Sequence, residues 1–400
     1  SMDRSWPLTY LQLLHPTPFK GMGNGAGSRR RSKQPPESND DDDDVEILQG
    51  SVSFTKQVSH QSCATEYSQG DVVAPLECFN DVDSQASASE DSLSRIASTA
   101  SSNAQYGEAA QTLIFMDWDD TIFPTSAIFA ECPSSTIRDP SRDIPPSLVA
   151  SLARWRVALY KFLTLACSVS ERCTIITNST RPWVHQCVMR FIPEALPLFE
   201  SHAGVHVVYA GEVPTKPQRR SGLRAVRREV ELKELEVHDK LTKAKLEAMQ
   251  QAANTFYSKY PGQTWKNILS IGDMPYEHSA VQEMTFRRVA PARERVRTKA
   301  ITVPSEPSIC EAAFRLELQV RLLPAYVHHD GDLSVELEAL QDHIQVLATA
   351  LNMSDLASVE FPESAWGPEP QLDCEATAAA LEELGGKVQS SLLQNLRRQH

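Results

Sequence analysis

The feature that most constrains the fold is a series of short apolar runs that alternate with helical patterns from Gln111 onward. Each run is rich in aliphatic and β-branched residues, and such short runs are typical of buried strands. The five runs cover residues 112–116, 173–176, 205–209, 267–271 and 299–303. Strands that alternate with helices predict an α/β fold, here a doubly wound and mainly parallel sheet of five strands.

The segments between these runs repeat apolar residues at the spacing of helices. Residues 146–168 do so, and a further helix opens at Pro182, where Ser179 or Thr180 could cap its N-terminus. Similar patterns cover 222–258, 276–284, 307–323 and 333–352. Most strands are therefore followed by a helix, as parallel pairing requires.

The first 108 residues differ from the rest in composition. They contain 8 Lys and Arg against 16 Asp and Glu, a net charge of 8 − 16 = −8 out of −13 for the chain, together with 18 serines. Such a segment buries too little apolar surface to offset its loss of conformational entropy, so we predict a disordered, acidic, serine-rich tail over 1–108. The basic cluster at 29–33 fits either a nuclear-import or kinase signal or a solvated charge run.

The folded part is expected at 109–352, where the α/β domain includes a charged helical insertion at about 211–244. Residues 353–400 are expected to form a flexible tail. A helix over 376–398 would be weakened there by Gly385-Gly386. Both tails are candidates for recruiting protein partners.

Composition disfavours several classes of protein. The net charge of −13 argues against binding to nucleic acid, and no stretch reaches the roughly 20 apolar residues that a membrane span needs. The eight cysteines contain no Cys-x-x-Cys pair, which disfavours a disulfide framework or a zinc site. Because the sequence begins without a signal-peptide pattern, we expect a reducing compartment, cytoplasmic or nuclear.

Polar residues follow three of the predicted strands at the point where each strand ends. Asp117 and Asp119 follow the first strand, and Thr177 with Asn178 follows the second. Asp273 follows the fourth strand. Ligands of open α/β sheets bind outside the carboxyl ends of the strands, so these side chains are the candidates for a functional site.

These residue types suit phosphoryl chemistry. Neighbouring carboxylates such as Asp117 and Asp119 repel each other unless a cation or a shared proton relieves them, and oxygen ligands that include Asp273 suit Mg²⁺. One carboxylate can attack phosphorus to form an aspartyl-phosphate, and the other can protonate the leaving oxygen and then deprotonate water. Thr177 would donate a hydrogen bond to the phosphoryl group, and a lysine would offset the negative charge.

The motifs resemble those of the haloacid dehalogenase (HAD) superfamily of phosphohydrolases, with a small or minimal cap. The first motif, a hydrophobic strand followed by Asp-x-Asp-x-Thr, is matched by Asp117, Asp119 and Thr121. The second, hydrophobic residues followed by Thr or Ser, is matched at Thr177. The fourth, Gly-Asp-x-x-x-Asp/Glu, is matched by Gly272-Asp273 and Glu277.

The resemblance implies a role for each matched residue. Asp117 would be the nucleophile and Asp119 the general acid/base. Mg²⁺ would bind the Asp117 carboxylate, the Asp119 main-chain carbonyl and Asp273, with Gly272 and Glu277 beside the ion. The remaining implied phosphate-binding residues are Thr121, Thr177, Asn178 and a lysine. In this superfamily an acid at position 119 fits phosphoester chemistry and not dehalogenation.

The lysine of the third motif has more than one candidate in the sequence. The candidates are Lys240, Lys243, Lys245 and Lys259. Lys245 is favoured because it lies in the helical segment before the fourth strand, 273 − 245 = 28 residues ahead of Asp273. Lys243 does not share a helix face with it, so only one of these two can point inward. Solvated helix lysines remain the alternative for all four.

Two functions follow as expectations. The first is a Mg²⁺-dependent phosphatase that acts on a phosphorylated protein or small molecule. The insertions at 126–143 and 211–242 look too short for a full cap domain, and an open cleft admits a large substrate such as a phosphoprotein. The alternative is a catalytically weak scaffold or binding protein of the same fold that recruits partners through its tails.

Overall fold

A computed structural model describes residues 105–139, 141–201, 204–213, 229–259, 263–286, 295–337, 342–362, 365 and 374–398. Most of the predicted tail 1–108, including the basic cluster, lies outside these residues. So does the part of the predicted insertion between Val213 and Glu229. All described residues belong to one compact unit.

The centre of the fold is a parallel sheet of six strands. They are β1 (Thr112–Met116), β2 (Arg172–Thr177), β3 (Val205–Tyr209), β4 (Asn267–Gly272), β5 (Arg297–Thr302) and β6 (Leu333–Glu336). The strand order is β3-β2-β1-β4-β5-β6, and every neighbouring pair is parallel. The predicted α/β class and parallel sheet are confirmed, and all five apolar runs form strands.

The sixth strand corrects the prediction of five. Residues 333–352 were expected to form one helix, but β6 (Leu333–Glu336) occupies the first part and α11 (His343–Leu351) the last. In β6 the first and third residues are buried and the second and fourth are exposed, as in a strand with one covered face. Asp342 then caps α11 by accepting hydrogen bonds from two main-chain amides.

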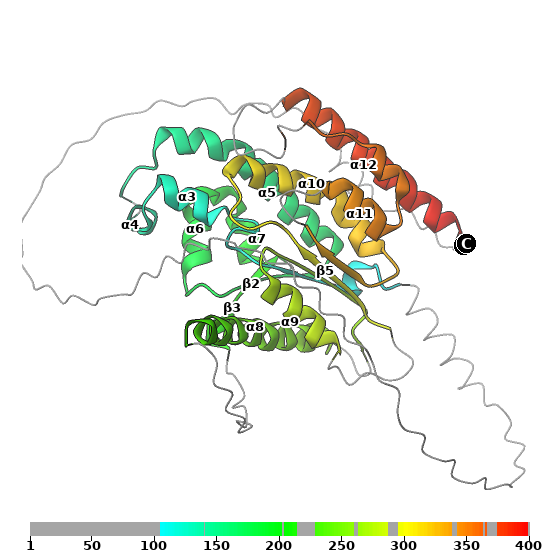
Figure 1. The fold of residues 1–400 in the computed structure, drawn as a ribbon, viewed down its shortest axis with the longest axis horizontal. Coiled ribbons are helices and arrows are strands. Elements are labelled where there is room, and N and C mark those ends of the chain that lie inside the picture. The colour runs from blue at the N-terminus through cyan, green and yellow to red at the C-terminus, as the bar shows by residue number, and fades with distance from the viewer. Residues whose placement is uncertain are drawn as a thin grey trace, which may run out of the picture. The chain divides into compact units, whose positions relative to one another are not determined.

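Helices cover both faces of the sheet (Figure 1). One face is covered by α8 (Glu229–Phe256) and α9 (Pro275–Phe286). The other is covered mainly by α5 (Pro146–Val169), α6 (Trp183–Phe191) and α10 (Ile309–His328). The shorter helices are α3 (Thr125–Glu131), α4 (Ser134–Arg138) and α7 (Leu196–Glu200). None of the helices in the described ranges is long and apolar enough to cross a membrane.

Alternation along β1 divides the apolar residues between two cores. Leu113 and Phe115 pack with α8 and α9, whereas Ile114 and Met116 pack with α5 and α10. Successive side chains of a strand point to opposite faces, so the next odd-numbered residue, Asp117, is directed toward α8 and α9. The register of β1 therefore decides which helices supply partners to this carboxylate.

The strand order changes direction between β1 and β4. The first three strands extend from β1 to one edge of the sheet, and the chain then returns to pair β4 with the other side of β1. In open α/β sheets the ligand site lies at the carboxyl ends of the strands where this reversal occurs. Asp117 and Asp273 are the residues that follow β1 and β4.

The connection from β5 to β6 differs in hand from that between β4 and β5. Both steps move the same way through the sheet, but α9 packs on one face and α10 on the other. One of the two crossovers is therefore left-handed, which is rare, because about 98% of parallel crossovers are right-handed. Packing explains the position of α10, because most of its apolar residues are buried in the core that it shares with α5.

The C-terminal helix is longer and better packed than the sequence indicates. α12 (Cys374–Arg398) continues through Gly385-Gly386, and Ala380, Leu384 and Val388 on its inner face are buried in the larger core. Gly385 lies against Arg321, because a Cβ added there would stand 3.2 Å from Arg321 Cδ. Packing thus compensates for the low helix propensity of glycine, and residues 374–398 form a docked helix where a flexible tail was expected.

A buried lysine lies near the amino end of β5, away from the carboxyl ends. Lys299 donates hydrogen bonds to Asn267 Oδ1 and, at 3.4 Å, to the main-chain oxygen of Val327. The ring of Tyr106 lies 5.5 Å from its Nζ. Burial and, to a smaller extent, the charge of the neighbouring Arg297 together lower the pKa of Lys299 to about 7.

This lysine should make the stability of the protein depend on pH. Its ordinary pKa is 10.5, so between pH 7 and 10 the unfolded chain holds more protons than the folded one. The free energy of unfolding should therefore rise with pH in this window, by at most about 1.4 kcal/mol per unit. We expect Lys299→Met to remove this rise in urea unfolding from pH 7 to 9, while exposed Lys240→Met keeps it. Equal pH slopes in the parent and Lys299→Met would contradict the assignment.

Candidate active site

A tight turn follows β1 and fixes the carboxylates on either side of Trp118. The main-chain oxygen of Trp118 accepts hydrogen bonds from the amides of Ile122 (3.2 Å) and Phe123 (2.9 Å). The rings of Trp118 and Phe123 stack with centroids 5.2 Å apart. Asp120 takes φ = 55°, a conformation that Asp tolerates better than most residues. Asp117 and Asp119 therefore leave the strand in fixed and different directions.

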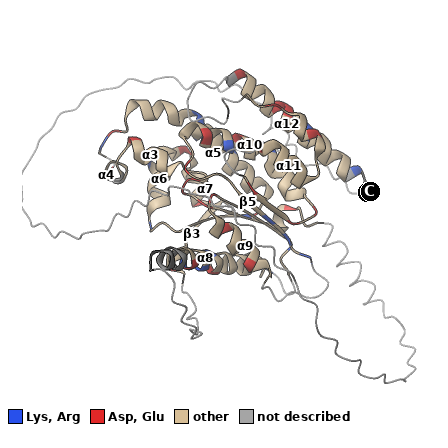
Figure 2. Cartoon of the chain, in the orientation of Figure 1, with Lys and Arg blue, Asp and Glu red and all other residues tan. Residues whose placement is uncertain are grey.

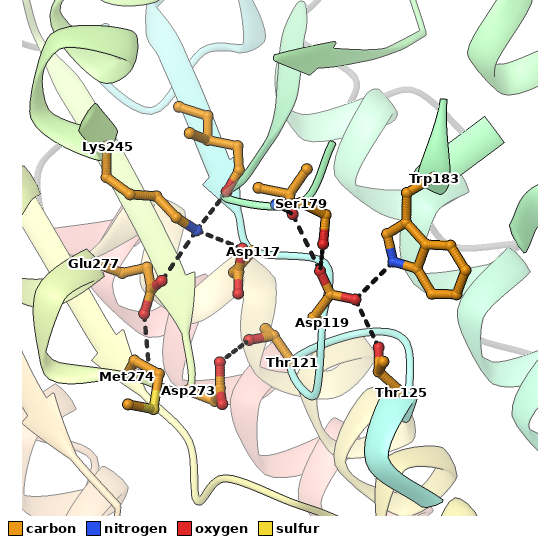
Figure 3. Close-up of polar contacts among 12 residues, drawn as sticks. Asp117, Asp119, Thr121, Thr125, Ser179, Trp183, Lys245, Asp273, Met274 and Glu277 are labelled. Carbon is orange, nitrogen blue, oxygen red and sulfur yellow. Dashed lines mark hydrogen bonds and ion pairs between the residues drawn. The ribbon is translucent and has the colours of Figure 1, made fainter. Parts of the chain in front are cut away.

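The Asp117 side chain meets a buried lysine and a second acid (Figure 3). Lys245 forms an ion pair with Asp117 Oδ1, donates to the main-chain oxygen of Ile176 at 2.5 Å, and lies 3.0 Å from Glu277 Oε1. The side chains of Lys245, Asp117 and Glu277 are 1%, 6% and 2% exposed. A buried ammonium group contacts two buried carboxylates here.

The position of Lys245 follows from the apolar stripe of α8. The coloured part of this helix in Figure 2 carries both acidic and basic residues, but Lys245 shares a face with the buried Met249 and Ala253, at the spacing of one helical turn. Lys243 instead lies near Glu247 at 4.0 Å, and Lys259 pairs with Glu171. Of the four candidate lysines, the structure places Lys245 at the carboxyl end of β1.

Glu277 is held by the segment after β4. Its Oε2 accepts a hydrogen bond from the Met274 amide at 2.9 Å, while Oε1 faces Lys245. A Cβ on Gly272 would lie 2.8 Å from Glu277 Cβ, so a side chain at 272 would displace this acid. The glycine at position 272 thus allows the close approach of strand and carboxylate.

Asp273 completes a buried acidic group. Its Oδ1 accepts a hydrogen bond from Thr121 Oγ1 at 3.0 Å. One oxygen from each of Asp117, Asp273 and Glu277 lies within 4.8 Å of the other two, close enough to hold a metal ion. The predicted ligands Asp117 and Asp273 are therefore brought together, with Glu277 beside them.

Within the described part of the chain, this group places three carboxylates around a single ammonium group, that of Lys245. Burial raises the pKa of Asp117 well above its usual range, although Lys245 opposes the shift, and Glu277 and Asp273 raise it further by repulsion. Burial and the charge of Glu277 raise the pKa of Asp273 to about 7. Burial alone would lower the pKa of Lys245, but Asp117 and Glu277 raise it, so the lysine stays charged. A divalent cation would neutralise the excess negative charge.

Asp119 lies on the other side of the turn, with a different set of partners. Its Oδ1 accepts from Thr125 Oγ1 (2.7 Å) and Trp183 Nε1 (2.8 Å), and its Oδ2 from Thr177 Oγ1 (3.1 Å) and Ser179 Oγ (2.7 Å). The predicted residues Asp119 and Thr177 are thus in contact. The metal role that the resemblance gives Asp119 concerns its main-chain carbonyl, and its carboxylate is engaged by these four donors.

Three of these donors were missed at the sequence level. Ser179 was considered as a helix cap, but α6 begins at Trp183 without a side-chain cap, and Ser179 binds Asp119 instead. Thr125 is the first residue of α3 and directly precedes the insertion expected at 126–143. Nothing in the linear pattern distinguishes Trp183 from a buried core tryptophan.

The predicted phosphate binder Asn178 lies beside the hydroxyl of Tyr276. The ring of Tyr276 in turn lies 5.8 Å from Lys245 Nζ, within the range of a cation–π contact. Asn178 follows Thr177, so both amide and hydroxyl stand at the carboxyl end of β2. The segment after β2 thus adds neutral donors beside the acidic group.

Removal of the buried ammonium group should destabilise the fold strongly. Lys245→Met leaves Asp117 and Glu277 buried without their cation, and breaking such a pair costs about 3–5 kcal/mol. The matched control is Lys243→Met in the same helix, whose partly exposed pair with Glu247 should contribute less than about 1 kcal/mol. Urea unfolding at neutral pH without divalent ions measures both. Equal stability of the two variants would contradict the assignment.

The described structure brings the predicted site residues to the carboxyl ends of β1, β2 and β4. Asp117, Lys245, Asp273 and Glu277 form one group, and Asp119 with Thr177 forms a second across the same turn. Comparisons with protein-family models, with curated proteins and with solved structures give no match for this chain.

Proposed function

We propose that the protein is a Mg²⁺-dependent phosphomonoester hydrolase of the HAD type, acting through an aspartyl-phosphate on Asp117. The observation that carries this proposal is the placement of the buried Asp117–Lys245 pair at the reversal of strand order, beside Asp273 and Glu277. A nucleophilic carboxylate, a fixed cation and two further acids are the groups that phosphoryl transfer through an aspartate requires.

The acidic group fits Mg²⁺ by the chemistry of its donors. All are carboxylate oxygens, which suit hard cations, and their buried negative charge exceeds that of Lys245. Asp117 and Asp273 would hold the ion, while Glu277 is engaged by Lys245 and the Met274 amide. Bound Mg²⁺ would supply positive charge to a phosphate oxygen, which lowers the repulsion met by an attacking carboxylate.

In the first step, Asp117 attacks phosphorus. A carboxylate oxygen of Asp117 forms the new bond to phosphorus, the bond from phosphorus to the ester oxygen breaks, and the departing oxygen takes a proton from Asp119. Lys245 and the turn after β1 hold the Asp117 carboxylate at one orientation, so less orientational freedom is lost on reaction. The products of this step are the free alcohol and phospho-Asp117.

In the second step, water releases the phosphate. Asp119, now ionised, takes a proton from water, whose oxygen bonds to phosphorus as the bond to Asp117 breaks. Inorganic phosphate leaves, and both aspartates return to their starting states. Hydroxyl groups of Thr177 and Ser179 and the amide of Asn178 surround the carboxyl end of β2, where they could donate to phosphate oxygens.

The size of the flap favours a large substrate. Between the first and second motifs, α3 and α4 are short helices, and α5 packs in the core on one face of the sheet. Among the described residues nothing forms a separate cap domain. We therefore extend the proposal to phosphoproteins, because an open site admits a protein-bound phosphate.

Mutation of the two aspartates tests the mechanism. With Mg²⁺ and an aryl phosphate, Asp117→Asn should lower kcat by more than about 10³-fold through loss of the nucleophile. Asp119→Ala should lower it by about 10²–10⁴-fold through loss of the acid/base. EDTA should abolish activity in the parent. Phosphate release under steady-state conditions measures each effect.

The matched control is Asp139→Asn, which removes an exposed aspartate that pairs with Arg142. It should retain activity within about twofold, since surface pairs contribute little. Full activity in Asp117→Asn would exclude the covalent mechanism. Activity in EDTA equal to that in Mg²⁺ would exclude the metal.

A further inference from the structure

The two oxygens of Asp119 are held by donors from different parts of the chain (Figure 3). Oδ1 accepts from Thr125 at the start of α3 and from Trp183 at the start of α6. Oδ2 accepts from Thr177 and Ser179, which both belong to the end of β2 and the segment after it. The two oxygens of this carboxylate therefore have different sets of donors.

The four donors use the full accepting capacity of the carboxylate. An ionised carboxyl group accepts about four hydrogen bonds, two at each oxygen. A leaving-group oxygen can therefore reach Asp119 only if one pair of donors turns away. The chemistry of the donors indicates which pair that is.

The donors on Oδ2 are free to exchange partners. Thr177 and Ser179 contribute hydroxyl groups, which rotate and can donate to a phosphate oxygen as readily as to Asp119. Both stand at the strand end where the phosphate of the substrate would bind. When phosphate takes these hydroxyl groups, Oδ2 becomes available and can take up the proton that a phosphomonoester monoanion brings into the site.

The donor from Trp183 is fixed. An indole nitrogen donates only along one direction, and this side chain is 8% exposed. Its ring packs edge-on against Phe123, with centroids 6.1 Å apart, and against Phe129 at 5.5 Å. The packing prevents the indole from turning, so its hydrogen bond to Oδ1 persists when other partners change.

We propose that Trp183 and Thr125 are positioning residues that hold Oδ1 of Asp119: the indole N–H cannot turn, and the Thr125 hydroxyl lies at the start of α3 and not at the strand end where phosphate would bind. Oδ2 is then the oxygen that gives its proton to the leaving group. This inference rests on the proposed phosphatase function, and it gives the two oxygens of the acid/base different roles, anchoring for Oδ1 and proton transfer for Oδ2. The bond between phosphorus and the ester oxygen breaks, the proton passes from Oδ2 to that oxygen, and Oδ1 stays bound to the indole throughout.

The anchor should matter in proportion to the basicity of the leaving group. An alkoxide needs a proton as it departs, whereas 4-nitrophenolate is a weak base and leaves with little help from an acid. Loss of the anchor should therefore slow alkyl phosphates more than aryl phosphates. If Trp183 had only a structural role, its substitution would slow both kinds of ester equally.

The test compares kcat for 4-nitrophenyl phosphate and glycerol 2-phosphate in the full chain with Mg²⁺. Trp183→Phe should lower kcat for the alkyl ester about tenfold more than for the aryl ester. The matched control is Trp155→Phe, because Trp155 is also buried against Phe123 but donates to the main-chain oxygen of Ile122 at 3.0 Å. That variant should show the same ratio as the parent.

Thr125 supplies a second, conservative comparison. Thr125→Val removes the hydroxyl at similar volume and should shift the ratio of kcat between the two esters in the same direction as Trp183→Phe. Thr125→Ser keeps the donor and should show the ratio of the parent. The indole N–H resonance of Trp183, identified by its loss in Trp183→Phe, should move in Asp119→Ala. That readout does not require activity.

The outcomes separate this inference from the function on which it rests. A parent chain inactive on both esters would overturn the phosphatase proposal and the anchor with it. An active parent in which Trp183→Phe slows both esters equally would overturn the anchor alone. An indole resonance unmoved by Asp119→Ala would also overturn it.

Discussion

The ion pair between Asp117 and Lys245 is the interaction on which the site depends. Each buried charge costs several kcal/mol to remove from water, so the pair is stable only with close geometry and further hydrogen bonds. The Ile176 carbonyl and Glu277 supply these. Because the partners come from β1, β2, α8 and α9, the pair ties the middle of the sheet to the helices of one face. Gly272 permits this by letting Glu277 lie directly against β4.

Most of the fold can be predicted from the alternation of apolar runs and helical patterns in the sequence. The observed elements differ from this prediction where tertiary packing outweighs local propensity. Apolar runs flanked by helical segments identify five strands, because buried parallel strands need continuous apolar side chains. The edge strand β6 is four residues long, and its alternation is hidden beside helix-forming residues. The double glycine at 385 and 386 lowers helix propensity, but the apolar face of α12 finds a partner in the core.

The site divides in the same way. Asp117 and Lys245 are candidates from sequence alone, since Asp117 directly follows a predicted strand and Lys245 lies in the helical segment before the fourth strand. The environment of Asp119 cannot, because Thr125 and Trp183 meet it only after the turn and α6 are folded. Two carboxylates separated by one residue thereby acquire different surroundings. One is buried beside an ammonium group and two acids, and the other is ringed by neutral donors.

The most direct test of the central claim is to trap the covalent intermediate. The protein is mixed with Mg²⁺ and a phosphomonoester, quenched in acid during turnover, and treated with borohydride, which reduces an acyl phosphate to an alcohol. Peptide mass spectrometry should then find homoserine in place of Asp117, and only in samples that contained substrate. Turnover that leaves position 117 unreduced, or that places phosphate on another side chain, would contradict the account.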